Sequence, residues 1–384
     1  MSGQGVHQPI EEPVLLVRCA ALAAPDLNSY LEGGGFVGAS AAADSSPLEI
    51  ITTLRQAALR GRGSAGHPVF LKWFAHAQGR GPGYLVVDAR QADPRGLTNQ
   101  ALIQGNPFGL LEGLSIAALA LKTARARVLL PPGASGQRDF LRAALAQYLA
   151  HRPLEEQTPR LELEFLEGED EGGTGRALRH CLETWHQITL VFCLGVARFL
   201  AQGMHGQGGT RLVTVGGQVH RPGLVEVPMG AHLWQVLDAA GGLSAPARFH
   251  ALCLDQGLSG FLPLEAAATP LAPEELITAG VNPGFGTLWA LDEGACLVRQ
   301  TRQALRLLDR PAGQGEPARQ ATARALSLVD GLCRSNPGPE NLAQLTGLCQ
   351  DLQAQGWPAA WPLGSSLMHF MPHWQEHQAG RVCA

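Results

Sequence analysis

The sequence predicts an α/β domain, followed by a small β-grasp module and a C-terminal helical bundle. Up to about residue 200, short apolar strands alternate with amphipathic helices, which is typical of an α/β domain. At 211–242, a strand, a Gly-Gly turn, a Pro-Gly turn, a second strand and a short helix follow one another, as in a β-grasp module. From 291 to 377 the apolar spacing is helical, with breaks at Pro311 and at 336–339.

Apolar patterns place the elements of the first domain. The apolar residues of 47–60 share one helical face, and the run GYLVVDA at 83–89 is typical of a buried strand. We expect helices at 47–60, 107–122 and 137–150, and strands at 83–89, 127–130 and 161–166. Residues 1–45 are expected to be irregular, apart from a short element at 30–36.

The longest apolar stretch is ITLVFCLGVARFL at 188–200. A membrane-spanning helix needs ~20 apolar residues, and Arg198 interrupts this run. We therefore expect a buried helix and no transmembrane segment. The N-terminus shows no basic region followed by an apolar run, so a signal peptide is not expected and a cytoplasmic location is favoured.

Charge and cysteine content limit the functional classes. The formal net charge is −4 and no basic patch dominates, which argues against a general nucleic-acid binder. None of the 8 cysteines lies at CxxC spacing, which weakens both zinc and iron–sulfur interpretations. Isolated cysteines in a chain without a leader favour a reducing compartment and small buried thiols.

The most informative motif is the loop LRGRGSAGHPVFLKW at 59–73. Its glycines alternate with arginines, so backbone N–H groups can wrap an anion while cationic side chains lie beside it. Lys72 adds a point charge that suits a phosphate. The alternative is structural: the glycines make the turn and the arginines pair internally.

With these segments in this order, the chain resembles the NADH-binding flavoprotein subunit of respiratory complex I. Relatives of that subunit serve NAD-linked hydrogenases and formate dehydrogenases. Four motifs carry the resemblance over nearly the whole chain: the loop at 59–73, the strand from Tyr84 with the Asn106-Pro107 helix, GQVHRPGLVEVPMG at 217–230 and AAWPLGSSLMHF at 359–370.

The resemblance implies three domains: an FMN/NADH domain, an SLBB-type β-grasp domain and a helical bundle that holds a four-iron cluster in the family. On this basis we divide the chain into an N-terminal extension at 1–45, a truncated α/β FMN/NADH-type domain at 46–205, the β-grasp domain at 206–290 and the bundle at 291–384.

In the family the first loop lies against FMN, so the resemblance assigns a residual FMN/NADH site to the matching residues. These are Gly61, Arg62, Gly63, Ala65, Gly66, Lys72, Asp88 and Asp93. Ser64 and His67 depart from the loop pattern, where glycine and an aromatic residue are usual. FMN and NADH are therefore the cofactors that a working site would take.

The second flavin segment of the family reads NADExEPG, and its polar end is rewritten here at 88–95. Arg90 and Gln91 replace two acids, and an arginine only donates, so it cannot accept from ribityl or ribose hydroxyls. Asp93 keeps an acid where the second glutamate belongs. In the third segment, Thr174 and Gly175 replace paired glutamates that position nicotinamide in the family.

The iron–sulfur motif CxxCxPCREGT of the family aligns with AGQGEPARQAT at 312–322. Pro317, Arg319 and Thr322 still match and fix the register. The ligand positions then carry no thiol: they are Ala312, Gly315, Ala318 and, for the fourth ligand, Gln353. Because the cluster requires thiolates, the sequence predicts that the four-iron cluster is absent.

Two further patterns have structural interpretations that we favour over metal binding. His369, His373 and His377 recur every fourth residue and could ligate a metal from one helical face, but Pro372 interrupts that helix. The acidic run at 167–171 is typical of a solvated loop.

Three functional hypotheses follow. The favoured one is a non-catalytic accessory subunit of a complex-I-like or formate dehydrogenase-like oxidoreductase. Its partners would be a thioredoxin-like two-iron subunit and a large iron–sulfur subunit, and any membrane association would be peripheral, through them. The second is an active FMN-dependent NADH dehydrogenase subunit that passes electrons to a partner's cluster. The third is a free-standing module that binds a small ligand through its β-grasp domain.

Overall fold

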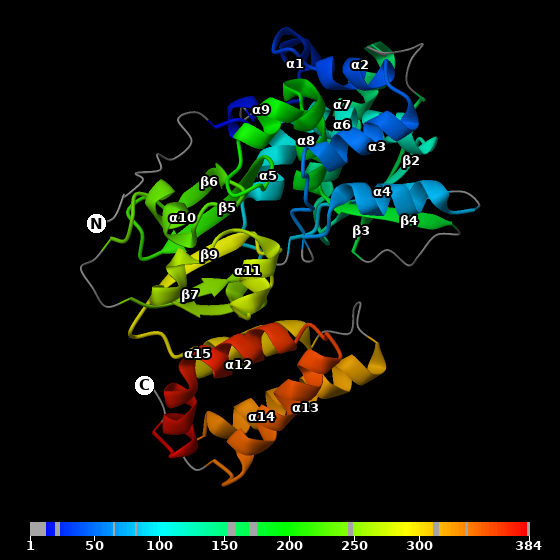
Figure 1. The fold of residues 1–384 in the computed structure, drawn as a ribbon. Helices are drawn as coiled ribbons and strands as arrows, with labels where there is room; N and C mark the ends of the chain where they lie inside the picture. Colours follow the sequence, from blue (N-terminus) through cyan, green and yellow to red (C-terminus); the bar gives the residue numbers. More distant parts are fainter. Residues whose placement is uncertain are drawn as a thin grey trace. The chain divides into compact units, whose positions relative to one another are not determined.

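The computed structural model describes residues 13–19, 24–63, 66–80, 83–91, 93–151, 159–168, 175–244, 249–309, 315–334 and 337–381 (Figure 1). These residues form two compact units. The first contains the described residues up to 91, together with 96–212 and 226–231. The second contains 93–95, 213–225 and the described residues from 232 onward. The predicted order of an α/β domain, a β-grasp domain and a helical bundle is confirmed.

The first unit is built on a parallel sheet with the strand order β3-β2-β1-β4. Its strands are β1 (Gly83–Asp88), β2 (Arg125–Leu130), β3 (Glu162–Glu167) and β4 (Arg176–Cys181). Leu85, Val86 and Val87 are fully buried, as expected for an inner strand covered on both faces. Three of these strands follow the predicted ranges. β4 escaped prediction because its arginines and histidine break the apolar pattern.

Helices occupy the predicted ranges 47–60, 107–122 and 137–150, and two further helices, at 69–78 and 98–105, were not predicted. They are α3 (Pro47–Gln56), α4 (Val69–Gln78), α5 (Thr98–Gly105), α6 (Pro107–Leu121) and α7 (Ser135–His151). α3 starts with a capping box between Ser46 and Glu49, and Pro47 occupies a first-turn position where no N–H is needed. α6 is buried almost all round, which explains its apolar sequence.

Residues 24–43 are not irregular, and this expectation was wrong. They form α1 (Leu27–Glu32) and α2 (Val37–Ala43). Asp26 caps α1, and the buried carboxylate of Glu112 accepts hydrogen bonds from Phe36 N at 2.9 Å and Ala39 N at 3.0 Å. Both N–H groups lie at the start of α2, where helices leave donors without a backbone partner. One acid inside α6 thus anchors a helix that short-range patterns do not reveal.

The apolar run at 188–200 is buried in large part but does not form one helix. It is divided between α8 (Leu182–Leu194) and α9 (Val196–Ala201), because Gly195 adopts φ = 76° and ends the first. Within the described residues, we find no helix with the length and apolar character that crossing a membrane requires.

The second unit contains a five-stranded sheet with the order β6-β5-β9-β7-β8. Its strands are β5 (Thr210–Gly217), β6 (Gly223–Pro228), β7 (Phe249–Leu254), β8 (Gly260–Pro263) and β9 (Thr287–Asp292), with helices α10 (Leu233–Ala239) and α11 (Pro273–Thr278). β5 pairs with β9 in parallel, whereas β7 is antiparallel to its neighbours. The predicted strand–turn–strand–helix order at 211–242 is confirmed.

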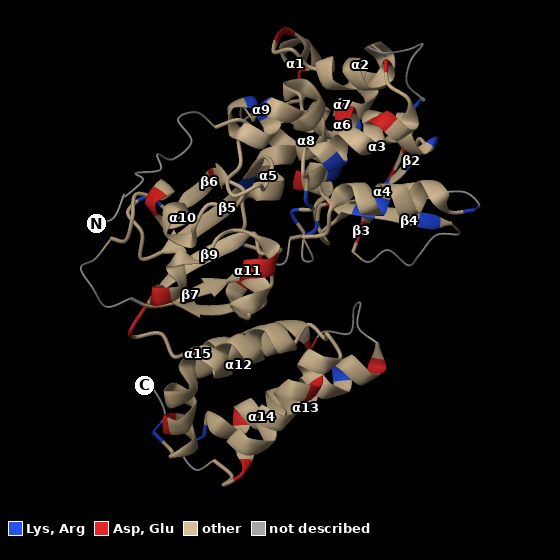
Figure 2. Ribbon diagram, viewed as in Figure 1, with Lys and Arg blue, Asp and Glu red and all other residues tan. Residues whose placement is uncertain are grey.

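The same unit ends in four helices, α12 (Leu297–Leu308), α13 (Glu316–Leu332), α14 (Asn341–Ala354) and α15 (Ala360–Gln378). Apolar residues from all four form one core, which includes Leu305, Val329, Leu352 and Trp374. Acidic and basic positions are interspersed along the outer side of α13 (Figure 2). Three short 3-10 turns complete the described elements, at Leu16–Arg18, Asp255–Gly257 and Leu264–Ala268.

Candidate functional site

The strand order of the first unit places a candidate site at the carboxyl ends of β1 and β4. The chain leaves β1 toward β2 on one side, whereas β4 lies on the other side of β1. Parallel sheets bind ligands outside such a reversal of strand order. Asp88 and Cys181 are the last residues of the two strands and lie in register. The glycine-rich loop reaches this edge: Arg62 N donates to Thr184 Oγ1, just beyond β4, at 2.8 Å.

Arg62 is buried and its donors are used inside the first unit. Its Nε donates to Thr210 O at 2.9 Å, and its two terminal nitrogens donate to Arg60 O and Gly208 O at 2.9 Å each. Burial lowers the pKa of Arg62 to about 10 although the Glu183 carboxylate opposes this. The guanidinium therefore joins two backbone segments, at 60 and at 208–210, which matches the structural alternative of the sequence analysis.

The described glycines of the loop hydrogen-bond within the loop itself. Gly61 N donates to His67 O at 2.9 Å, and Gly66 N donates to Gly63 O at 3.1 Å. Gly66 has φ = 56°, a conformation that favours glycine. Arg60 closes the turn by donating to Gly66 O at 3.2 Å. Ser64 and Ala65 lie outside the described residues, so the tip of the predicted cradle remains a prediction.

Lys72, on α4, donates its ammonium group to the carbonyl oxygen of Arg179 in β4. Burial is the main reason why the pKa of Lys72 is held below its ordinary value, and the Arg179 guanidinium adds to the effect. Burial and the nearby Lys72 ammonium lower the pKa of His180, whose Nε2 accepts from Trp73 Nε1 at 3.0 Å. His180 is thus a neutral acceptor inside the protein that sequence reasoning had not singled out.

Asp88 is paired with two guanidinium groups. Arg90 donates to both of its carboxylate oxygens, at 2.9 and 2.8 Å, and Arg179 approaches Oδ2 to 3.2 Å. These donors outweigh burial and hold the pKa of Asp88 below its ordinary value. The arginine that replaces a family acid at position 90 therefore neutralises the neighbouring acid instead of presenting an acceptor.

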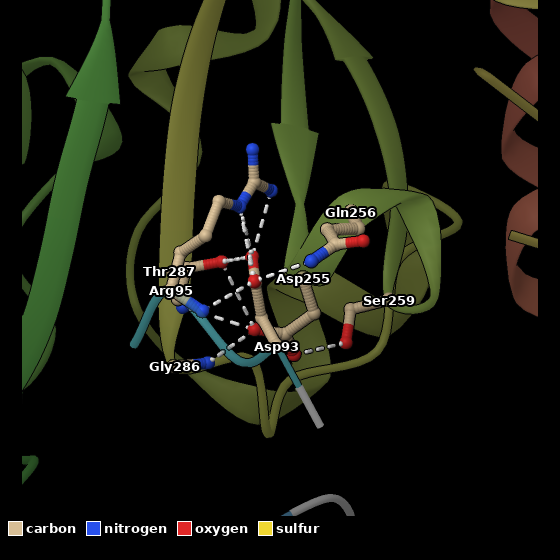
Figure 3. Close-up of polar contacts among 7 residues, drawn as sticks. All are labelled: Asp93, Arg95, Asp255, Gln256, Ser259, Gly286 and Thr287. Carbon is tan, nitrogen blue, oxygen red and sulfur yellow. Dashed lines mark hydrogen bonds and ion pairs between the residues drawn. The ribbon is translucent and has the colours of Figure 1, made fainter. Parts of the chain in front are cut away.

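Asp93 belongs to the second unit, whereas the loop residues with which sequence reasoning grouped it belong to the first. Its carboxylate has no exposed surface and accepts from Arg95, from Gln256 Nε2 at 2.7 Å and from Thr287 Oγ1 at 2.7 Å (Figure 3). Asp255 lies in the same network and accepts from the N–H groups of Gly286 and Thr287 at 2.9 Å each. Figure 3 shows these side chains converging beside β9.

These contacts test whether the described residues fit FMN. A flavin site needs polar atoms directed at the ribityl and phosphate groups, yet both acids and both cations assigned to it bind other protein groups. The described polar side chains therefore do not fit FMN as they stand. Gly63 nevertheless lies near Cys181, the last residue of β4, so the loop backbone runs past the strand end where the motif comparison expects a flavin.

Sequence reasoning assigned Arg62 to the site but missed Arg211 and Glu183, two buried charged groups near it. Arg62, Arg211 and Glu183 are each less than one-tenth exposed. Burial raises the pKa of Glu183 to about 7 despite the two neighbouring guanidinium groups, and its Oε1 accepts from Leu212 N at 2.8 Å. A single acid at the start of a segment, 183–197, that holds no other Asp, Glu, Lys or Arg is the signal that could have revealed Glu183.

The remaining predicted positions are only partly described. Gly175 precedes β4 with φ = 134°, and Thr174 lies outside the described residues, as does Ala312. Of the other cluster-ligand positions, Gly315 is exposed at the start of α13, Ala318 is buried and Gln353 lies on α14. Alanine, glycine and glutamine side chains supply no thiolate for a cluster at these three places.

A shallow cavity of about 300 Å³ lies at the opposite, amino end of the same sheet. It is lined by the first residues of β1, β2 and β3, including Tyr84, Arg127 and Glu164. Arg127 and Glu164 are paired across it at 2.9 Å. The cavity contains none of the residues that the sequence analysis assigned to a site.

Two family models match the chain. The first match covers the parallel sheet, and the second begins in the five-stranded sheet. Residues 54–184 match the Nuo51 FMN-binding domain, and residues 212–256 match the SLBB domain. The first match spans the loop, the parallel sheet and the start of α8, and the second begins in β5.

Relatives resemble the chain over most of its length. An NADH-quinone oxidoreductase subunit of Streptomyces coelicolor is 27% identical over 93% of this chain and 89% of its own length. An NADP-reducing hydrogenase subunit of Solidesulfovibrio fructosivorans, HndC, is 22% identical over 95% of this chain and 83% of its own length.

A solved structure shares the fold. An NAD+-reducing NiFe-hydrogenase in the H2-reduced state superimposes with a TM-score of 0.78 at 22% identity, over 92% of this chain. This chain spans 66% of the length of that hydrogenase chain. The two domain matches, their order and the curated relatives agree with the resemblance inferred from the motifs. The chain therefore contains a Nuo51 FMN-binding domain followed by an SLBB domain, and over most of its length it is similar to subunits of NADH-quinone oxidoreductases and of an NADP-reducing hydrogenase.

Proposed function

We propose that this chain is an accessory subunit of a multisubunit NAD-linked oxidoreductase and does not itself oxidise NADH. The observation that supports the proposal is that the polar side chains at the family's site positions bind other groups of this protein. Asp88 and Asp93 are each bound to arginine inside the protein, and Arg62 and Lys72 donate to backbone carbonyls. A hydride-transfer site needs such groups aimed at cofactor and substrate.

Altered residues in the family motifs support the same conclusion. Thr174 and Gly175 stand where paired glutamates position nicotinamide, and Gly315, Ala318 and Gln353 cannot ligate iron. On this proposal the electron path of the parent subunit is lost and its fold is kept for docking. The proposed partners are a thioredoxin-like two-iron subunit and a large iron–sulfur subunit, and any membrane association is peripheral, through them.

The rival function is an active FMN-dependent NADH dehydrogenase subunit with a remodelled site. One observation favours it: the glycine-rich loop lies at the carboxyl end of β4, at the reversal of strand order where parallel sheets bind ligands. On this hypothesis Gly61, Gly63, Ala65 and Gly66 approach FMN through the backbone, and a partner's cluster receives the electrons.

The visible absorption spectrum of the purified full chain, before and after NADH, separates the two functions. The chain is measured as isolated and again after incubation with excess FMN followed by desalting. We expect no flavin absorbance in either sample and no NADH-dependent reduction of ferricyanide. A flavin spectrum that bleaches on addition of NADH would contradict the accessory role. The S. coelicolor relative, treated in parallel, serves as the positive control.

A further inference from the structure

The second unit contains a cluster of metal-type ligands that the proposed function does not use. Cys296, His373 and His377 each offer one ligand atom, and these atoms all lie within 4.8 Å of one another. Cys296 and His377 are buried and His373 is half-buried. Cys296 stands 81 positions from His377, so the histidine spacing alone could not reveal this cluster.

His377 is oriented as metal-binding histidines usually are. Its Nδ1 lies 3.1 Å from the carbonyl oxygen of Leu332, and a carbonyl only accepts, so Nδ1 carries the proton. In the neutral ring Nε2 is then the nitrogen with the lone pair, and it faces Cys296 Sγ at 3.3 Å. A backbone carbonyl that fixes the tautomer of a ligating imidazole is a common outer partner of metal sites.

Cys296 also occupies a position that favours a thiolate. It is the N-cap residue of α12, and its Sγ accepts from Arg299 N at 3.5 Å. The start of a helix stabilises negative charge through its unpaired N–H groups and its dipole. The sulfur thus lies where an anionic ligand is stabilised, while the imidazole opposite offers a neutral nitrogen.

His250 provides a second, independent observation. Its ring lies 5.6 Å from that of His373, and its buried Nε2 has no hydrogen-bond partner among the described residues. Buried polar atoms are nearly always satisfied, so this nitrogen calls for a partner such as a water molecule or another polar group beside His373. The kink at Phe370, where φ is −128°, precedes Pro372 and reorients the last part of α15, which carries His373 and His377.

We propose that Cys296, His373 and His377 bind one zinc ion, beside His250. Thiolate and imidazole are the ligands that zinc prefers, and a tetrahedral zinc ion holds S and N ligands roughly 3.5 Å apart. The 3.3 Å between Cys296 Sγ and His377 Nε2 matches one edge of that tetrahedron. Binding replaces the thiol proton, which leaves to solvent, and the metal joins α12 to α15.

The structure therefore does not bring together the three histidines that recur every fourth residue: only His373 and His377 belong to the cluster. His369 does not take part: its Nε2 is 2.9 Å from Ala279 O, in another part of the second unit. The site also differs from the positions that hold the family's iron–sulfur cluster, because none of Gly315, Ala318 and Gln353 belongs to it. The inference does not depend on the accessory role proposed above.

Cobalt(II) titration of the full-length chain tests the site, because Co²⁺ reports thiolate ligation through its charge-transfer absorption. The chain is first stripped with a chelator, and bound zinc is then measured by elemental analysis after adding Zn²⁺. We expect one equivalent of either metal per chain. Cys296→Ser should abolish the charge-transfer band, and His373→Gln should weaken Co²⁺ binding at least tenfold.

Cys333→Ser and Cys349→Ser are matched controls, because both thiols lie in the same bundle outside the cluster. Both variants should keep the full band. A band that survives Cys296→Ser, or wild-type binding well below one equivalent, would overturn the proposal. His373 is half-buried, so His373→Gln keeps the test valid if Cys296→Ser fails to fold.

Discussion

The carboxylate of Asp93 accepts a hydrogen bond from the hydroxyl of Thr287, with 2.7 Å between Oδ2 and Oγ1. The two residues are 194 positions apart, and Thr287 begins β9. Motif comparison assigned this acid to a flavin. In the structure it instead ties the segment 93–95 to a sheet of the second unit, where Arg95 also stacks on Trp289 with 3.9 Å to the ring centroid.

Asp93→Ala should destabilise the second unit by about 2 kcal/mol, because it removes a buried acceptor and leaves the donors of Gln256 and Thr287 unsatisfied. Hydrogen bonds from Arg95 and Thr287 outweigh burial and lower the pKa of Asp93. Its contribution is therefore complete above the ordinary carboxyl pKa and is lost as the pH falls through the lowered value. Urea unfolding measures the change. Asp139→Ala, at an exposed ion pair, should cost less than about 0.5 kcal/mol.

Glu183 should make the stability of the first unit decrease as the pH rises. Its pKa is raised from 4.5 to about 7, so the folded state favours the uncharged acid. Stability is then complete below pH 4.5 and falls as the pH rises through about 7, by about 3 kcal/mol in total. Glu183→Gln keeps an acceptor for Leu212 N and should remove this slope. Equal slopes for wild type and variant between pH 5 and 8 would refute the assignment.

Glu112→Leu should release α1 and α2. The acid accepts from Tyr30 Oη at 2.5 Å as well as from Phe36 N and Ala39 N, so the variant leaves three donors without an acceptor. Hydrogen exchange should accelerate at residues 36–43 while the β1 amides keep their protection. Burial and the Glu112 charge raise the pKa of Tyr30, so Glu112→Gln should lower it in a spectrophotometric titration.

Lys72→Ala should leave NADH oxidation by the host complex within twofold of wild type, because Lys72 is used inside the first unit. Lys122→Asn is the matched control: it removes the same charge at a position whose φ of 53° asparagine tolerates. A loss of more than tenfold in Lys72→Ala alone would favour the active flavoprotein hypothesis.

Local patterns predicted β1, β2, β3, α3, α6 and α7 of the first unit, because apolar runs need no partner to be recognised. The fully buried β1 and α6 are the clearest cases. Prediction from local patterns failed where a single residue, often a distant one, determines the local structure. Glu112 supports α2 from more than seventy positions away, and Gly195 ends α8 through its positive φ inside an apolar run.

The candidate site was less predictable than the fold for the same reason. The motif at 59–73 correctly indicated a turn at a strand end, yet the partners of Arg62 lie near 184 and 208–210. Asp93 keeps the acidic character of the family position, but it belongs to the second unit and not to the unit of the loop. The spacing of His373 and His377 contained no hint of Cys296, which only the packing of α12 against α15 brings near.

The bonds of Glu226 have a consequence for the order in which the chain acquires structure during synthesis. Glu226 accepts from Leu15 N and Leu16 N, 211 and 210 positions earlier, and from Thr210 Oγ1. Long-range closure of this kind is slow and delays folding. A nascent chain that ends before residue 226 already contains every strand of the parallel sheet. It still lacks Glu226, the acid that accepts the hydrogen bonds from Leu15 N and Leu16 N. This α/β unit therefore completes its fold only after the ribosome has translated into the β-grasp domain.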